Sequence, residues 1–191
     1  MITKYDIDNI DFKIFHKIIH PLEKFYRQEE NYRLLSYLST KFNNTIILDI
    51  GANLGFSALA LSYNDSNLIY SFDIINSMYP RILEKHNIRL FIQDLFIHKI
   101  LLEWKEIILN SSLIYFDLGP IIDNTNFMMY NFLKSNNYQG IILYNDIKHQ
   151  YNYDYFWKKI PDTEKVDLTD IGNFMGIGMI TFNDDYRRSF F

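Results

Sequence analysis

Short apolar runs rich in Ile, Leu, Phe and Tyr alternate along the chain with longer segments in which apolar residues recur every three or four positions. The short runs are typical of buried strands, and the wider spacing is typical of helices with one buried face. The runs predict strands at Thr45–Ile50, Asn67–Phe72, Ile88–Ile92, Ser112–Phe116 and Gln139–Tyr144. The segments between them predict helices near Phe56–Ser62, Ser77–His86, Ile97–Leu109 and Asn124–Ser135. This alternation predicts right-handed βαβ units and a parallel sheet with helices on both faces.

The two ends of the chain extend this pattern. Before the first strand, Pro21–Phe42 has helical spacing and predicts one helix or two short ones. After the fifth strand, Tyr153–Lys159 predicts a short helix, and Lys165–Thr169 and Gly176–Phe182 predict a strand hairpin. We therefore expect a single domain over residues 1–191, with an N-terminal helical segment at 1–44 and an α/β core at 45–191. The expected architecture is a Rossmann-like three-layer sandwich around a seven-stranded, mostly parallel sheet with one antiparallel strand.

Composition narrows the class of protein. The 191 residues are 48% hydrophobic and 22% charged, as expected for a folded domain with its own core. No apolar run approaches the ~20 residues of a membrane helix, the start lacks a signal-peptide pattern, and cysteine is absent. A net charge of -4 disfavours broad binding to a nucleic-acid backbone, and the small basic pair Arg187-Arg188 is interpreted as a solvated tail. We expect a cytoplasmic protein, in the host cytoplasm if the AT-rich residue bias reflects a viral source.

The most informative motif follows the first predicted strand and reads Asp49-Ile50-Gly51-Ala52-Asn53-Leu54-Gly55. Glycine adopts backbone angles that other residues avoid and, without Cβ, lets a ligand approach the main chain. A dinucleotide site has the pattern Gly-x-Gly-x-x-Gly and holds a pyrophosphate at a helix N-terminus. Here three residues separate Gly51 from Gly55. The loop therefore predicts a cofactor pocket, and its spacing disfavours a nicotinamide dinucleotide.

Aspartate residues end four predicted strands in succession, and another closely follows the next strand: Asp49, Asp73, Asp94, Asp117 and Asp146. In an open α/β sheet, ligands bind at the carboxyl ends of the strands, where the strand order reverses. Asp73 lies 22 residues beyond Gly51, about the spacing at which an acidic side chain accepts hydrogen bonds from ribose hydroxyls. Aspartate also favours loops and helix caps for structural reasons. The whole series at one edge nevertheless indicates a binding site.

With these features, the segment from about Thr45 to Phe182 resembles the class I S-adenosylmethionine-dependent methyltransferases. The glycine loop matches their motif I in its Asp-Ile-Gly-Ala-Asn variant. The resemblance implies S-adenosylmethionine as the cofactor. It implies that Gly51, Asn53 and Gly55 shape the loop that holds the methionine part of the cofactor. It also implies that Asp49 orients the methionine amino group, directly or through water.

The same resemblance assigns the nucleoside part of the cofactor to the next two strand ends. Asp73 would bind the ribose hydroxyls, and Ile74 would pack on the adenine face. Asp94, with its neighbours Gln93 and Leu95, would meet the adenine edge.

Two later strand ends resemble the acceptor side of small-molecule methyltransferases. Leu113–Asp117 and Gly140–Asp146 are similar to elements of the catechol and macrocin O-methyltransferase branches, in which two carboxylates help to bind a divalent metal. Asp117 and Asp146 are thus candidate catalytic residues and candidate metal ligands. Carboxylates suit Mg²⁺, which can polarise a hydroxyl acceptor. His149 could supply a ligand or a general base, or lie in an exposed loop.

The pattern departs from those branches at two positions. Asn145 stands where the first acid of an Asp-Asp pair is expected, and Ile147 stands where the catechol enzymes have Asn. Metal dependence therefore stays open. The sequence predicts methyl transfer from S-adenosylmethionine to a small-molecule acceptor, at a hydroxyl. The alternative from another class is a non-catalytic cofactor-binding module that acts through a protein partner.

Nucleic acid is disfavoured as the substrate, because Asp117-Leu118-Gly119-Pro120 lacks the (Asn/Asp)-Pro-Pro-aromatic motif of the DNA and RNA N-methyltransferases. No membrane partner is expected, and assembly into a homo-oligomer is compatible with the sequence. The aromatic residues at Tyr151–Trp157 could line a substrate pocket or belong to the core. The glycine-dense segment Asp167–Gly178 could form a lid or a structural turn.

Overall fold

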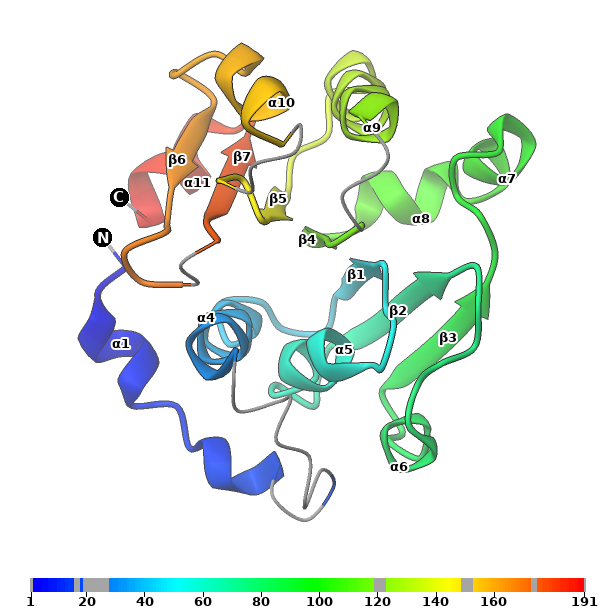
Figure 1. Cartoon of the computed structure of the whole chain (residues 1–191), viewed down its shortest axis with the longest axis vertical. Coiled ribbons are helices and arrows are strands. Elements are labelled where there is room, and N and C mark those ends of the chain that lie inside the picture. The colour runs from blue at the N-terminus through cyan, green and yellow to red at the C-terminus, as the bar shows by residue number, and fades with distance from the viewer. Residues whose placement is uncertain are drawn as a thin grey trace.

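The strands form one mixed sheet in the order β3-β2-β1-β4-β5-β7-β6 (Figure 1). The computed structural model describes residues 2–15, 18, 28–118, 123–148, 153–172 and 175–190. The strands are β1 (Ile46–Ile50), β2 (Leu68–Asp73), β3 (Ile88–Ile92), β4 (Leu113–Phe116), β5 (Ile141–Asn145), β6 (Lys165–Asp167) and β7 (Ile177–Thr181). β7 runs antiparallel to both of its neighbours, whereas the pairs among β1 to β5 are parallel. The prediction of a seven-stranded sheet with one antiparallel strand is confirmed.

Helices cover both faces of the sheet, which gives the predicted three layers. They are α1 (Lys4–Asp8), η1 (Phe12–Phe15), α4 (Glu29–Ser39), α5 (Phe56–Leu61), α6 (Pro80–Leu83), α7 (His98–Glu103), α8 (Lys105–Asn110), α9 (Asp123–Ser135), α10 (Tyr153–Lys159) and α11 (Asp184–Phe190). In Figure 1, α4, α5 and α6 lie on one face, and α8, α9 and α10 lie on the other. Among the described residues, none of the helices combines the length and the apolar character needed to cross a bilayer.

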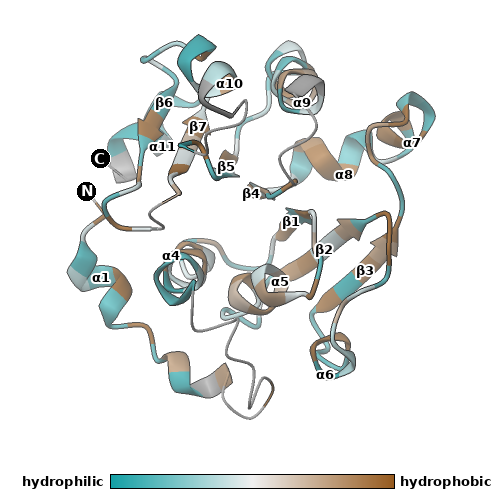
Figure 2. Ribbon diagram, in the orientation of Figure 1, coloured by the Kyte–Doolittle hydropathy of each residue, from teal (hydrophilic) through white to brown (hydrophobic). Residues whose placement is uncertain are grey.

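The two faces of the sheet carry separate hydrophobic cores. One cluster joins Leu34 and Leu38 of α4 to Ile47 and its neighbours in the sheet, and the other joins Met129 of α9 to Leu48. Each fully buried side chain of this size contributes about 1.5–3 kcal/mol. Figure 2 shows the hydrophobic colour on the strands, while α4 is largely hydrophilic in colour. The central strands β1, β4, β5 and β7 are therefore buried on both faces, as their continuous apolar runs predict, whereas the edge strands β3 and β6 are partly exposed.

Helix boundaries differ from the predictions more than strand boundaries do. The predicted helix at Ile97–Leu109 is divided at Trp104, whose ring packs within 4.6 Å of the Phe91 ring, centroid to centroid. The predicted helix at Ser77–His86 is reduced to Pro80–Leu83. Of the predicted helix at Pro21–Phe42, residues 21–27 lie outside the described part of the chain. The structure describes its remainder as α4 with short turns on each side.

Each end of the chain contains a helix whose bounds were not predicted from the sequence: α1 within the predicted N-terminal helical segment, and α11 after the last strand. Thr3 and Asp6 form a capping box at the start of α1. Arg187 and Arg188, interpreted from the sequence as a solvated tail, lie in the helix α11, where Arg188 is exposed and Arg187 is partly exposed. Arg187 donates hydrogen bonds to the backbone carbonyl oxygens of Asp162 and Thr163.

The aromatic cluster belongs in part to the core. Phe156 and Trp157 are buried, and the Phe156 ring lies 4.8 Å from the Tyr144 ring. A Cβ on Gly178 would lie 2.4 Å from the Trp157 ring, so the glycine allows that ring to pack on β7. Tyr151 lies outside the described residues. These contacts support the core role for Phe156 and Trp157 and a structural role for Gly178.

The reversal of strand order lies between β1 and β4. From β1 the chain proceeds to β2 on one side, and from β4 it proceeds to β5 on the other. The loops that leave the carboxyl ends of β1 and β4 therefore diverge and leave a crevice between them. Gly51 and Asp117 are the residues that follow these two strands.

Candidate functional site

The loop between β1 and α5 has left-handed backbone angles at three of its residues. φ is +93° at Gly51, 42° at Asn53 and +87° at Gly55. A Cβ on Gly51 would lie 2.1 Å from the carbonyl oxygen of Asp117, so only glycine fits against that backbone. A Cβ on Gly55 would lie 2.5 Å from Cγ of Met78. The glycine spacing thus reflects two close approaches in addition to the backbone angles.

Most backbone N–H groups of this loop are used within the protein. The N–H groups of Gly51 and Ala52 both donate to the carbonyl oxygen of Phe72, at 2.9 and 3.1 Å, and that of Gly55 donates to Ala52, at 2.7 Å. The N–H of Asn53 donates to Oδ2 of Asp73, at 2.7 Å. These donors form no open cradle of the kind that binds a pyrophosphate.

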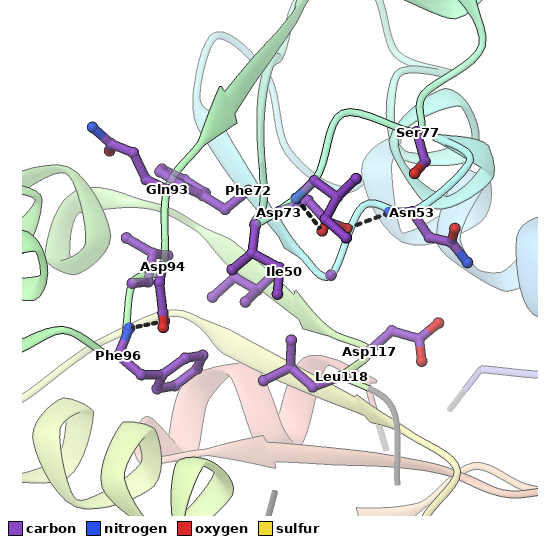
Figure 3. Close-up of a pocket in the computed structure, with 14 residues that line it drawn as sticks. Ile50, Asn53, Phe72, Asp73, Ser77, Gln93, Asp94, Phe96, Asp117 and Leu118 are labelled. Atoms are coloured by element: carbon purple, nitrogen blue, oxygen red, sulfur yellow. Dashed lines mark hydrogen bonds between the residues drawn. The ribbon is translucent and has the colours of Figure 1, made fainter. Parts of the chain in front are cut away.

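Asp73 ties the loop after β2 to the glycine loop. Its Oδ2 accepts the hydrogen bond from Asn53, and its Oδ1 accepts one from the backbone N–H of Ile75, at 3.1 Å. Each carboxylate oxygen has two acceptor positions, so both can accept a further hydrogen bond. Figure 3 shows this carboxylate beside a cavity, with the two bonds drawn as dashed lines.

The cavity at the ends of β1 to β4 has a volume of about 400 Å³, within the usual range for small-molecule sites. Its walls are largely apolar, with carboxylates at the strand ends (Figure 3). The residues around it include Ile50, Gly51, Asn53, Phe72, Asp73, Ile74, Ile75, Ser77, Gln93, Asp94, Leu95, Phe96, Asp117 and Leu118. We refer to this as the first cavity.

The structure places the residues predicted for the adenine around this first cavity. Ile74 is exposed at its rim and Leu95 is buried in its wall. Oδ1 of Asp94 accepts a hydrogen bond from the backbone N–H of Phe96, at 2.9 Å, which holds Phe96 at the cavity. Oε1 of Gln93 accepts from Nε1 of Trp104, at 2.6 Å, so its amide is held toward that ring.

A second cavity of about 320 Å³ is lined by the glycine loop as well and has mainly polar walls. It shares Gly51, Asn53 and Asp117 with the first cavity. Its other wall residues are Gln28, Tyr32, Ala52, Leu54, Phe56, Ser57, Asn145 and Asp146. A ligand that passes the loop at the shared residues can therefore occupy both cavities.

Asp49 lies beneath the loop and is fully buried. Its Oδ2 accepts a hydrogen bond from the hydroxyl of Ser71, at 3.0 Å, whereas its Oδ1 has no partner among the described residues. Burial raises the pKa of Asp49 to about 7, against the lowering effect of Ser57 and Ser71. The nearby carboxylates of Asp117 and Asp73 raise it further.

Asp117 follows β4 and lines both cavities. Its Oδ1 accepts a hydrogen bond from Nδ2 of Asn145, at 3.1 Å, and its Oδ2 accepts a longer one from the hydroxyl of Tyr115, at 3.4 Å. Burial raises the pKa of Asp117, and these two donors oppose that shift. A carboxylate whose pKa is raised by burial is a stronger base than an exposed aspartate, which suits it to accept a proton.

The predicted metal site is not supported by the described residues. Among them, no group of three or more His, Cys, Asp or Glu side chains could hold a metal ion. Asp117 and Asp146 line the same cavity, but Asn145 and Tyr115 direct hydrogen-bond donors toward the Asp117 carboxylate. His149 lies outside the described residues. The two carboxylates thus do not form a fitting Mg²⁺ site.

Several residues of the site were not predicted from the sequence. Gln28 and Tyr32 of the α4 region line the second cavity, as does Ser57 of α5. Helical spacing predicts that α4 exists, but it does not show over which edge of the sheet the helix lies. Asn145 departs from the acidic pattern expected at its position, and its amide is bonded to Asp117.

No protein-family model matches the chain, and no curated protein matches its sequence. Solved structures do resemble it. The methyltransferase PaMTH1 of Podospora anserina, with S-adenosylhomocysteine bound, matches with a TM-score of 0.58 and 15% identity, over 90% of this chain and 86% of that one. A candidate caffeoyl-CoA O-methyltransferase of Staphylococcus aureus matches with a TM-score of 0.56 and 15% identity, over 93% of this chain and 98% of that one.

An RNA methyltransferase of Salinibacter ruber, in complex with S-adenosylhomocysteine, is also similar. Its TM-score is 0.51 at 12% identity, over 80% of this chain and 90% of that one. At these identities the likeness shows the fold. The chain has the Rossmann-like α/β fold that these methyltransferases share, with its strand order reversed between β1 and β4.

Proposed function

We propose that the chain is an S-adenosylmethionine-dependent methyltransferase that acts on a small-molecule acceptor. The observation that carries this proposal is the meeting of two cavities at Gly51, Asn53 and Asp117. One cavity is largely apolar with carboxylates at its edge, as a nucleoside requires. The other is polar, as an amino-acid group and a polar acceptor require. Similar folds with bound S-adenosylhomocysteine support this assignment.

The proposed positions of the cofactor follow the contacts of the two cavities. Asp73 has acceptor capacity left on both carboxylate oxygens for ribose hydroxyls. Ile74 and Leu95 provide apolar surface for the adenine, with Asp94 at its edge. Oδ1 of Asp49, which has no partner among the described residues, fits a positively charged amino group, through water, because Asp49 itself is fully buried beneath the loop.

The loop argues against a nicotinamide dinucleotide on physical grounds. Its N–H groups at Gly51, Ala52, Asn53 and Gly55 already have acceptors, so a diphosphate would find few donors there. A sulfonium cofactor requires no such donors. It needs only close approach to the main chain, which the two glycines provide.

For the chemistry, we propose Asp117 as the group that receives the acceptor's proton, with Asp146 beside it in the second cavity. When bound, S-adenosylmethionine supplies a methyl group on an already activated sulfur. The protein's part is then to align the nucleophile, to exclude water and to take up the proton. A role for His149 remains a prediction, as does a hydroxyl as the acceptor group.

The charge of the second cavity favours a small molecule over a nucleic acid. Among its described wall residues, the charged side chains are those of Asp117 and Asp146. Carboxylates repel phosphates, and nucleic-acid sites normally gather Lys and Arg. The similarity to an RNA methyltransferase makes RNA the alternative that an acceptor screen must include.

Isothermal titration calorimetry with S-adenosylhomocysteine and with NAD tests the cofactor. We expect binding of the first and none of the second. The variant Asp73→Asn can keep an oxygen for the N–H of Asn53, but its amide nitrogen then faces the ribose and the N–H of Ile75, so affinity should fall about tenfold or more. Asp65→Asn is the matched control, since Asp65 is exposed and pairs with Lys85 on the surface. Binding of NAD alone, or equal affinity in both variants, would contradict the assignment.

A further inference from the structure

A buried chain of polar side chains leads from α4 to Asp117. Nδ2 of Asn31 donates to the hydroxyl oxygen of Tyr115, at 3.1 Å, and that hydroxyl donates to Oδ2 of Asp117, at 3.4 Å. On the opposite side, Nδ2 of Asn145 donates to Oδ1 of Asp117, at 3.1 Å. Asn31 and Tyr115 are fully buried, and Asn145 is nearly so. Three separate elements, α4, β4 and β5, thus meet at one carboxylate.

The direction of each hydrogen bond is set by chemistry. The amide of Asn31 is a donor only through Nδ2, so the hydroxyl oxygen of Tyr115 accepts this hydrogen bond. The hydroxyl hydrogen of Tyr115 then remains for a bond to Asp117. Each oxygen of Asp117 then receives one donor from the protein and keeps acceptor capacity for a ligand in the cavity. The carboxylate is held at two points, which restricts its rotation about the Cβ–Cγ bond.

We propose that Asn31 and Tyr115 are positioning residues that, together with Asn145, hold the Asp117 carboxylate toward the second cavity in the orientation needed to receive the acceptor's proton. This inference rests on the proposed function for its purpose, but the positioning itself is a property of the protein without any ligand. Tyr115 lies behind Asp117 in the hydrophobic cluster on the α4 side of the sheet and does not line the cavity. It acts through Asp117.

The titratable groups around Asp117 come from each element packed against it. Tyr115 lies on the same strand, Asp49 on β1, Tyr32 on α4, and Asp146 follows β5. The hydrogen bonds from Tyr115 and Asn145 both lower the pKa of Asp117. Removing either donor should therefore raise it, while the surrounding carboxylates stay in place.

Tyr138 provides a matched control for Tyr115. It is also a buried tyrosine, but its hydroxyl lies at the other end of the sheet, 3.4 Å from the hydroxyl of Ser111 and 3.4 Å from the carbonyl oxygen of Ile141. Tyr138→Phe removes a buried hydroxyl of the same kind without touching Asp117. A general effect of deleting such a group would appear equally in both variants.

The test is a pH titration by carbon NMR of protein labelled at the aspartate carboxyl carbons. The Asp117 signal is identified as the one missing from Asp117→Asn. Tyr115→Phe should raise its midpoint by about half to one pH unit, and Tyr138→Phe should leave it unchanged. Asn31→Leu should give a smaller rise, and no further rise when added to Tyr115→Phe, because Asn31 acts through Tyr115.

Asn31→Leu should fold, since it removes one hydrogen bond and also the Oδ1 atom that has no partner among the described residues. Asn31→Ala serves as a second variant. An unchanged midpoint in Tyr115→Phe, an equal shift in Tyr138→Phe, or additive effects of the Asn31 and Tyr115 changes would overturn the proposal. Calorimetry with S-adenosylhomocysteine on the same samples tests the proposed function separately, because the midpoints are measured without it.

Discussion

Replacing Gly51 by alanine should lower the free energy of unfolding more than replacing Gly55, the other glycine of the loop. At φ +93° an L-residue is strained, which costs about 1–2 kcal/mol. The added Cβ would also lie 2.1 Å from the carbonyl oxygen and 2.8 Å from the carbonyl carbon of Asp117. Those atoms belong to the backbone after β4 and cannot rotate away. Because β1 and β4 must separate, we expect a total loss of about 3–5 kcal/mol.

Gly55→Ala is the matched comparison, since its φ of +87° carries a similar strain. Its Cβ would meet Cγ of Met78 at 2.5 Å, and a methionine side chain can move. We therefore expect a loss of about 1–3 kcal/mol. Urea unfolding at equilibrium gives the free energies of unfolding for both variants and the wild type. If the two variants lie within about 0.5 kcal/mol of each other, the rigid contact between Gly51 and Asp117 is not what requires glycine.

Two further predictions concern charge at the site. Burial raises the pKa of Asp49 to about 7, above the unfolded value of about 3.9. Between these two values the native state binds a proton at Asp49 that the unfolded state does not bind. The free energy of unfolding should therefore fall as the pH rises from about 4 to about 7. Urea unfolding at several pH values should show a decrease of up to about 1.4 kcal/mol per pH unit in the wild type and a smaller decrease in Asp49→Asn. Equal decreases in the two proteins would show that Asp49 is already ionised in the native state at these pH values. Mg²⁺ should leave the melting temperature unchanged, and EDTA should leave the affinity for S-adenosylhomocysteine unchanged. The reason is that the carboxylate of Asp117 accepts hydrogen bonds from Asn145 and Tyr115. A rise in melting temperature with Mg²⁺ would instead support the metal site predicted from the sequence.

The strands could be predicted within about two residues because a parallel sheet buried on both faces requires continuous apolar runs. The ends of the helices were harder to predict. The break at Trp104 depends on rings from β2 and β3 that lie far away in the sequence. The capping box at Thr3 and Asp6 was present in the sequence, and it could have indicated α1. The pair Asp184 and Asp185 at the start of α11 is a similar signal.

For the candidate site, spacing along the chain indicated which strand ends meet but not which donors face them. Asp73, Asp94 and Asp117 do surround one cavity. The bond from Asn31 to Tyr115 joins residues 84 positions apart and depends on how α4 docks on the sheet. No local pattern encodes such a contact. The sequence could therefore indicate the carboxylates, and only the fold shows what holds them.

The hydrogen bond from Asn53 to Asp73 has a consequence for the kinetics of binding. The carboxylate proposed to receive the ribose also anchors the glycine loop, and the backbone N–H of Tyr79 donates to the carbonyl oxygen of Leu54, at 3.2 Å. The loop is therefore preorganised, and a ligand need not order it on arrival. Association should be fast and nearly free of a conformational step, so differences in affinity between cofactor and product should reside in their dissociation rates.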